Sequence, residues 1–194
     1  MDMAPKLELF LQGGPPPIVF TLGSAAVLDA GDFYEQSALA AEQLGERAVL
    51  LVGDDPRNLP GHRVPESICI VEYAPYSRLF PRASLIVHQG GVGTTAQALR
   101  AGKPMLVMPY SHDQPDNARR VRRLGIAKVI QRHRYRADTA AGLIGEMLAE
   151  PKYRERAAVI GAQVCAENGL REAGDALEQL ALRSGGRKPH VDSR

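Results

Sequence analysis

The stretch Ser84-Leu-Ile-Val-His-Gln-Gly-Gly-Val-Gly-Thr-Thr95 joins an apolar run to a glycine-rich turn, and a helical pattern follows it. This order predicts a strand, a tight turn and a helix. Three glycines remove side chains where a ligand has to touch the backbone: Gly90, Gly91 and Gly93. The start of the helix offers unpaired N–H groups and the positive end of a dipole, which favour phosphate. His88 ends the strand, where its imidazole can donate a further hydrogen bond.

Similar alternations run through most of the 194 residues. The predicted strands are Ile18–Leu22, Arg47–Val52, Ile68–Val71, Ser84–Val87, Met105–Met108 and Ala127–Ile130. The predicted helices are Asp32–Leu44, Gly93–Ala101, Gln114–Leu124, Asp138–Ala149, Pro151–Asn168 and Arg171–Arg183. Asp32 and Asp138 are candidate N-caps, and the candidate C-terminal stops are Gly45, Gly102, Gly125 and Gly169. Continuous apolar strands that alternate with helices predict an α/β, Rossmann-like parallel sheet with helices on both faces.

The usual order of six such strands is 3-2-1-4-5-6, and ligands bind at the carboxyl ends beside the switch between strands 1 and 4. Three polar turns fall there: Gly23-Ser24, the turn after His88, and the segment 109–114. Ser24 can donate its hydroxyl and N–H to a phosphate oxygen, although an ordinary strand-to-helix turn would look the same. Thr94 can cap the helix or reach a phosphate. Their convergence predicts a phosphorylated ligand.

Other residues leave two interpretations open. Tyr73 and Tyr76 follow the third strand, where a ring can stack on a base or simply pack in a loop. Asp113 and Gln114 suit sugar hydroxyls, but Asp113 can equally be an N-cap before the proline at position 115. The arginines of the segment 119–123 fit a solvated helix face best.

Composition sets the class of protein. The net charge of +2 gives no bulk attraction to nucleic acid, and no apolar run approaches the roughly 18 residues of a membrane span. Cys69 and Cys165 belong to no metal-binding pattern, so we expect a reduced, cytoplasmic chain without a metal site. Residues 1–17 end in three prolines and are predicted to be a linker, 18–183 a single domain, and 184–194 a disordered tail.

Taken together, the motif at 88–95, the Gly-Lys-Pro at 102–104 and Pro109-Tyr-Ser-His-Asp-Gln114 resemble the donor-binding signature of the UDP-glycosyltransferase family. The resemblance is strongest to the bacterial enzymes that glycosylate macrolides, glycopeptides and sterols, and it runs from about Pro16 to about Ile130. It implies the C-terminal half of a GT-B fold, which binds a UDP- or dTDP-sugar as donor and uses no cofactor. It also implies a partner, an N-terminal domain with the acceptor site and the catalytic base. No catalytic residue is then expected on this chain, and 1–17 would be the remnant of the interdomain linker.

The resemblance also implies roles for single residues. The diphosphate would be bound by Ser24, His88, Gly90, Gly91, Gly93 and Thr94. Tyr73 falls where plant relatives stack a tryptophan on uracil, and Ala74 where backbone reads the base edge. Asp113 and Gln114 fall at the hexose hydroxyls. Two positions depart from the plant signature: Ala96 stands where plant relatives hold the ribose with a glutamate, and Tyr76 replaces a glutamine.

Two other functions remain in competition. Gly91-Val-Gly-Thr-Thr-Ala96 fits G-x-G-x-x-A, and Asp113 lies 22 residues (113 − 91) beyond Gly91, as in an NAD(P)-binding oxidoreductase. That motif would stand on the fourth strand instead of the first, and it gives His88 no role. The chain could also be a non-catalytic partner fragment. Turnover and the choice between NAD and UDP distinguish these hypotheses.

Overall fold

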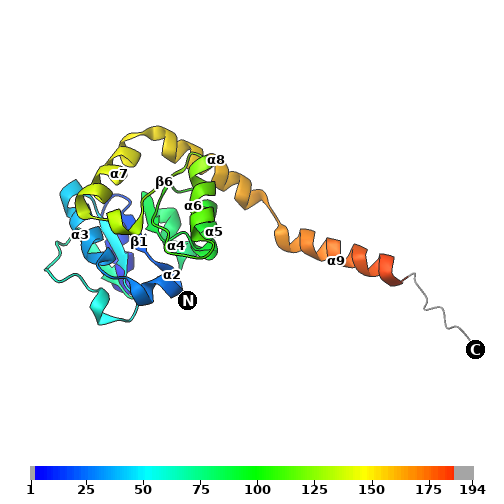
Figure 1. The fold of residues 1–194 in the computed structure, drawn as a ribbon, viewed down its shortest axis with the longest axis horizontal. Coiled ribbons are helices and arrows are strands. Elements are labelled where there is room, and N and C mark those ends of the chain that lie inside the picture. The colour runs from blue at the N-terminus through cyan, green and yellow to red at the C-terminus, as the bar shows by residue number, and fades with distance from the viewer. Residues whose placement is uncertain (1–2, 186–194) are drawn as a thin grey trace, which may run out of the picture.

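The computed structural model describes residues 3–185, whose body is a six-stranded parallel sheet covered by helices (Figure 1). The strands are β1 Ile18–Thr21, β2 Ala48–Leu51, β3 Ile68–Val71, β4 Leu85–His88, β5 Met105–Val107 and β6 Ala127–Val129. Their order is β3-β2-β1-β4-β5-β6, and every neighbouring pair is parallel. The predicted strands and their predicted order are confirmed.

Helices cover both faces of the sheet, which is why its strands are mostly apolar. On one face Phe20 and Leu50 pack with helices α3 (Phe33–Leu44) and α7 (Ala137–Ala149). The alternate residues Val19 and Val49 point to the other face. That face carries α1 Pro5–Gln12, α4 Tyr76–Leu79, α5 Val92–Arg100, α6 Gln114–Arg123 and part of α8 Pro151–Ala166. Shorter elements complete the body: α2 Gly23–Ala26 and the 3₁₀ turns η1 Val27–Asp29, η2 Pro56–Asn58, η3 Phe80–Arg82 and η4 Arg132–Arg134.

Helix α1 lies inside the range predicted to be a linker. Its Leu7 is fully buried against the sheet, and Glu8 pairs with Arg82 at 2.7 Å. The guanidinium of Arg47 lies 4.0 Å from the centre of the Phe10 ring and donates to the backbone oxygen of residue 15 at 2.6 Å. The sequence pattern did not predict this helix, and the domain boundary at 17/18 stays a prediction.

Three of the four predicted C-terminal stops agree with the structure. Gly45, Gly102 and Gly125 have φ of 66°, 64° and 72° just after α3, α5 and α6, as predicted for C-terminal stops. The prediction for Gly169 was wrong, because this residue begins α9 (Gly169–Gly185). Helix α8 ends instead where Glu167 adopts an extended conformation, with φ −70° and ψ 138°.

The two aspartates predicted as N-caps make other contacts. Asp32 stands at the N-cap position of α3 without a capping hydrogen bond, and its carboxylate accepts from Arg136 at 2.6 Å. Asp138 lies within the first turn of α7, so that prediction was wrong. The N–H of Ala137 donates instead to the side-chain oxygen of Gln36, at 2.8 Å. A residue of α3 therefore satisfies the start of α7.

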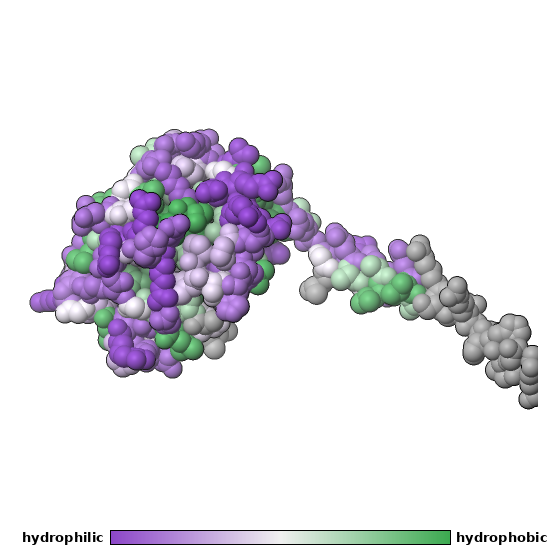
Figure 2. Space-filling model, viewed as in Figure 1, coloured by the Kyte–Doolittle hydropathy of each residue, from purple (hydrophilic) through white to green (hydrophobic). Residues whose placement is uncertain are grey.

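Helix α9 includes the predicted helix Arg171–Arg183 and extends away from the body (Figure 1). Hydrophilic residues cover most of the face shown in Figure 2, and apolar colour gathers along one side of α9, where Leu177 is exposed. Of the predicted tail 184–194, residues 184 and 185 end this helix and the remainder lies outside the described residues. Within the described range no helix has both the length and the apolar character needed to cross a membrane.

Candidate functional site

A cavity of about 760 Å³ opens at the carboxyl ends of β1, β2 and β3, against the start of α5. Its lining comprises Thr21, Gly23, Ser24, Val27, Leu51, Gly53, Asp54, Glu72, Tyr73, Pro75, Tyr76, Ser77, Gly93, Thr94 and Gln97. Four of the predicted site residues are thus brought together: Ser24, Tyr73, Gly93 and Thr94. They come from the ends of β1 and β3 and from the first turn of α5, as expected at a topological switch point.

The turn between β4 and α5 depends on glycine at position 90. Gly90 has a φ of 87°, and a Cβ there would lie 2.9 Å from Val107 and 3.2 Å from the backbone oxygen of Gln114. A Cβ on Gly91 would lie 2.7 Å from Nε2 of Gln89. Gly93 differs, because a Cβ there would meet nothing within 4 Å. Its open side faces the cavity, so a side chain there would occupy ligand space and not protein.

His88 is fully buried at the end of β4. Its Nδ1 accepts a hydrogen bond from the N–H of Gly90 at 3.0 Å, which puts the ring proton on Nε2. That Nε2–H has no hydrogen-bond partner among the described residues. Burial lowers the pKa of His88 to about 3, so the ring is neutral at physiological pH. His88 holds the glycine turn and keeps one spare donor, but it does not line the cavity, and a ligand reaches it only if covering atoms move.

Gln89 is a residue that the sequence patterns did not single out. Its side chain lies between the two turns, since a Cβ on Gly23 would come within 2.4 Å of its Nε2 and one on Gly91 within 2.7 Å. Gln89 is 6% exposed, and its Oε1 has no described partner. Buried polar atoms are nearly always paired, so the unpaired Oε1 makes Gln89 a candidate ligand contact although it does not line the cavity. The sequence signal that could have indicated Gln89 was the pair Gly23 and Gly91, because each leaves room for the amide of Gln89.

The aromatic loop after β3 divides into a fixed and an exposed tyrosine. The hydroxyl of Tyr76 shares a hydrogen bond of 2.8 Å with Thr21, and its ring stacks on Phe80 at 4.3 Å. Burial raises the pKa of Tyr76. Tyr73 is 61% exposed and lines the cavity, so its ring is available to a flat ligand. Ala74 is fully buried behind it and does not line the cavity.

Asp113 and Gln114 lie after β5, outside the residues that line the cavity. Oε1 of Gln114 accepts from the N–H groups of Tyr110 at 2.8 Å and Ser111 at 3.3 Å, so it shapes the loop before α6. Asp113 is exposed and stands at the N-cap position without a capping hydrogen bond. Its carboxylate instead accepts from Nδ2 of Asn117 at 2.7 Å.

Asn117 connects this loop with the glycine turn. Its Nδ2 also donates to the backbone oxygen of Gly90, at 2.9 Å. One amide therefore sets the position of α6 relative to the turn after β4.

His112, in the loop before α6, has a φ of 58°, a strained conformation for a residue with a Cβ. Neither Asn117 nor His112 was assigned a role from sequence, because the contacts that reveal them join separate elements.

The charges around the cavity are unequally distributed. Asp54 and Glu72 line it, and no lysine, arginine or histidine of the described residues does. The arginines of α6 lie elsewhere, and Arg119 and Arg120 both pair with Asp116 on the exposed side of that helix. Within residues 3–185 there is no group of three or more histidines, cysteines or acids that could hold a metal.

Residues 35–180 match the family described as erythromycin biosynthesis protein CIII-like, C-terminal domain. The chain belongs to this family. The resemblance inferred from the glycine turn and the Asp-Gln pair is thereby confirmed.

Several curated relatives of this chain are named as glycosyltransferases. The chain is 37% identical over 181 residues to an O-mycaminosyltylonolide 6-deoxyallosyltransferase of Streptomyces fradiae, a match that covers 92% of this chain and 41% of that protein. It is 32% identical over 186 residues to an uncharacterized glycosyltransferase of Mycobacterium leprae, covering 94% of this chain and 43% of the relative. The chain thus spans less than half the length of these relatives.

Solved structures with the same fold agree. The glycotransferase of kitacinnamycin superposes with a TM-score of 0.78 at 27% identity, over 86% of this CIII-like domain and 43% of that chain. The glycosyltransferase VinC, solved in complex with DTDP, gives 0.77 at 25% identity, over 94% and 45%. The predicted fold, a Rossmann-like half of a GT-B enzyme, is confirmed. The oxidoreductase hypothesis gains no support from these matches.

Proposed function

We propose that this chain is the donor-binding half of a hexosyltransferase. The enzyme moves a hexose from a UDP- or dTDP-sugar to a hydroxyl of a lipophilic or natural-product acceptor. One observation carries the proposal: the candidate contacts follow the strand order. Tyr73 stands after β3, Ser24 after β1, the glycine turn after β4, and Asp113 after β5.

This order matches the chemical order of a nucleotide sugar. A base on Tyr73 and Ala74 leads to a diphosphate between Ser24 and the start of α5, and then to a hexose near Asp113. The distance from β3 to β5 is four strand spacings, about 19 Å at about 4.8 Å each. The glycine turn supplies the N–H donors and the positive helix end that a diphosphate site without cationic side chains requires.

The relatives support the rest of the proposal. They are named as glycosyltransferases, and VinC was solved with a nucleotide diphosphate. Because the chain spans less than half of their length, we assign the acceptor site and the catalytic base to an N-terminal partner domain. Cys69 and Cys165 are free thiols, which supports a reducing, cytoplasmic location.

The isolated chain is expected to bind UDP or dTDP weakly and to transfer no sugar. Calorimetric titration with UDP, dTDP and NAD measures the first property, and incubation with UDP-glucose and a lipophilic acceptor measures the second. Tight NAD binding without UDP or dTDP binding would establish the oxidoreductase alternative. Sugar transfer by this chain alone would show that the catalytic base is present on it.

Asp113 and Gln114 are expected to affect the sugar and not the nucleotide. Asp113→Asn should lower affinity for UDP-glucose by about tenfold and leave UDP nearly unchanged, since a hydrogen bond to a charged group contributes about 1.5–3 kcal/mol and about 1.4 kcal/mol is a factor of ten. Gln114→Glu keeps an oxygen for the N–H groups of Tyr110 and Ser111 but loses the amide donor. It should therefore lower affinity for UDP-glucose severalfold without unfolding the loop, since a neutral hydrogen bond contributes about 0.5–1.5 kcal/mol.

The matched control is Asp138→Asn on α7, whose carboxylate accepts from Gln43 and which does not line the cavity. It should change neither affinity. Equal losses for UDP and UDP-glucose in the Asp113 and Gln114 variants, or a lowered melting temperature, would mean that both residues only shape the loop.

A further inference from the structure

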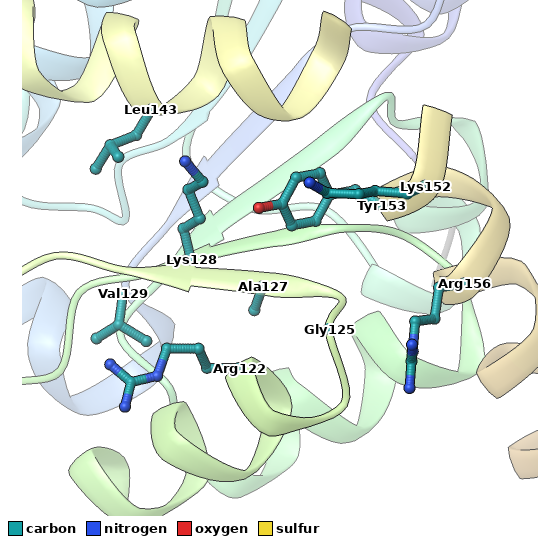
Figure 3. A pocket seen from close by; sticks show the side chains of 9 residues that line it. All are labelled: Arg122, Gly125, Ala127, Lys128, Val129, Leu143, Lys152, Tyr153 and Arg156. Atoms are coloured by element: carbon teal, nitrogen blue, oxygen red, sulfur yellow. The ribbon is translucent and has the colours of Figure 1, made fainter. Parts of the chain in front are cut away.

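A second hollow lies along β6, the strand at one edge of the sheet (Figure 3). Its volume is about 540 Å³, and its floor is the strand itself with the loop before it: Gly125, Ala127, Lys128 and Val129. The walls come from α6, α7 and α8. This hollow is separate from the cavity at the carboxyl ends, with which it shares no lining residue.

The backbone of β6 is half unpaired along this hollow. Met105 N–H donates to the oxygen of Ile126 at 3.0 Å, and Ile130 N–H donates to the oxygen of Val107 at 2.9 Å. In a parallel ladder alternate residues pair, so the N–H and C=O groups of Ala127 and Val129 point away from β5. No other strand of the described residues pairs with β6. These two donors and two acceptors therefore have no strand partner, and both residues line the hollow.

Cationic side chains stand on both sides of this edge. Figure 3 shows Lys128 and Tyr153 on the side of α7 and α8, and Arg122 on the side of α6. Lys128 pairs with Glu146 and Lys152 with Glu150. Arg122 and Arg156 have no ion pair within the described part of the chain, so the hollow carries a surplus of two positive charges.

We propose that the β6 edge binds an extended acidic segment of a partner protein, which adds a strand to the sheet. Strand addition takes its affinity from backbone hydrogen bonds and its specificity from alternate side chains. Successive residues of an added strand point to opposite faces, so acidic residues on one face would meet Arg122 and Arg156, and apolar residues on the other would lie beside Leu143 and Tyr153.

The same charges argue against other occupants. Two copies of this chain paired through β6 would bring the unpaired Arg122 and Arg156 of each copy together, which is repulsive. A compact polyanion would satisfy the arginines but leave the backbone groups of Ala127 and Val129 unpaired. The strand has only three residues, and short edges with lysine resist indiscriminate pairing. An acidic segment is attracted to the arginines beside β6, so it can pair with this short edge where other segments cannot, although with modest affinity.

The test uses the full chain and a blocked, fluorescein-labelled octapeptide of alternating glutamate and valine. At low salt we expect saturable binding by anisotropy, with shifted backbone amide signals of Ala127 and Val129. A lysine–valine octapeptide should not bind. Methylating alternate peptide nitrogens should weaken binding about tenfold. The double variant Arg122→Ala/Arg156→Ala should weaken it about fivefold, since exposed ion pairs contribute little each.

The matched control is Arg63→Ala/Arg171→Ala, which removes two exposed arginines outside the hollow and should leave binding unchanged. Three results would overturn the proposal. They are absence of binding at low salt, equal affinity of the methylated peptide, and tripolyphosphate binding that shifts arginine but not Ala127 and Val129 signals. Dimers in sedimentation that the Glu-Val peptide cannot dissociate would identify a second copy as the occupant instead.

Discussion

Replacing His88 with alanine is expected to weaken the binding of UDP or dTDP by about tenfold or more. The buried Nε2–H has no partner in the described structure, and the proposed diphosphate supplies one once the atoms that cover His88 move aside. A hydrogen bond to a charged group contributes about 1.5–3 kcal/mol, and about 1.4 kcal/mol is a factor of ten. Binding of free uridine or thymidine should hardly change, because neither carries the diphosphate. Calorimetry on both ligand pairs measures the difference.

Two further variants separate binding from folding, because His88 also holds the turn through Gly90. His88→Asn keeps an acceptor near the position of Nδ1 but loses the Nε2 donor, so it should bind diphosphate as poorly as the alanine variant. His88→Gln places an amide donor near Nε2 and should recover part of the affinity. If nucleoside and nucleotide binding fall together in all three variants, His88 is a structural residue only.

The pH dependence follows from the same burial. Since burial lowers the pKa of His88 from about 6.5 to about 3, the neutral ring is favoured in the folded state. The stability linked to this group is complete above about pH 6.5 and is lost as the pH falls toward 3. Between about pH 7 and 8 the contribution of His88 to nucleotide binding should therefore be constant.

Replacing Gly161 with valine is expected to destabilise the fold by about 3 kcal/mol. Helix α8 crosses the end of α5 at this residue, and a Cβ there would lie 2.6 Å from Cα of Gly102 and 3.0 Å from the backbone oxygen of Leu99. Overpacking against backbone costs about 1–3 kcal/mol or more, which exceeds the gain in helix propensity. For a domain of this size the melting temperature should fall by about 6–12 °C.

Gly142 provides the matched control, because it is an exposed helical glycine of α7 and a Cβ added to it would meet nothing within 4 Å. Gly142→Ala should stabilise the chain by about 0.5–1 kcal/mol, the difference in helix propensity. Gly161→Ala should have the opposite sign. Circular dichroism during denaturant unfolding measures all three. A neutral Gly161→Val would mean that α8 is free to shift away from α5.

The sheet could be predicted because its signals are local. Runs such as Ile68–Val71 are covered on both faces, so apolar continuity alone marks them, and the right-handed crossover rule leaves few strand orders. Helix α1 could not be predicted in this way. Its eight residues are held by Arg47, which lies 35 positions (47 − 12) beyond the end of the helix. That contact exists only after folding. The same holds for Gln36, which satisfies the start of α7 in place of Asp138.

The candidate site shows the same division. Glycines 90 and 91 were both recognised from sequence, and the structure shows why Gly90 is required, since its φ is 87° and a Cβ there would meet Val107 and the backbone of Gln114. Gln89 and Asn117 were missed, because their roles depend on which turns their side-chain amides contact in the folded chain and not on their residue type. Gln114 was recognised, but its contacts with the loop at 110–111 add a structural role to the predicted one.

The unequal charges of the 760 Å³ cavity give it a direction. Asp54 and Glu72 stand at the β2 and β3 side, and the N-terminus of α5 stands beyond β1 at the β4 side. The cavity is therefore an electric dipole, negative at one end and positive at the other. A molecule with a hydroxyl-rich end and an anionic end gains energy in one orientation and loses it in the other. The protein can thus align its ligand before any single hydrogen bond is formed.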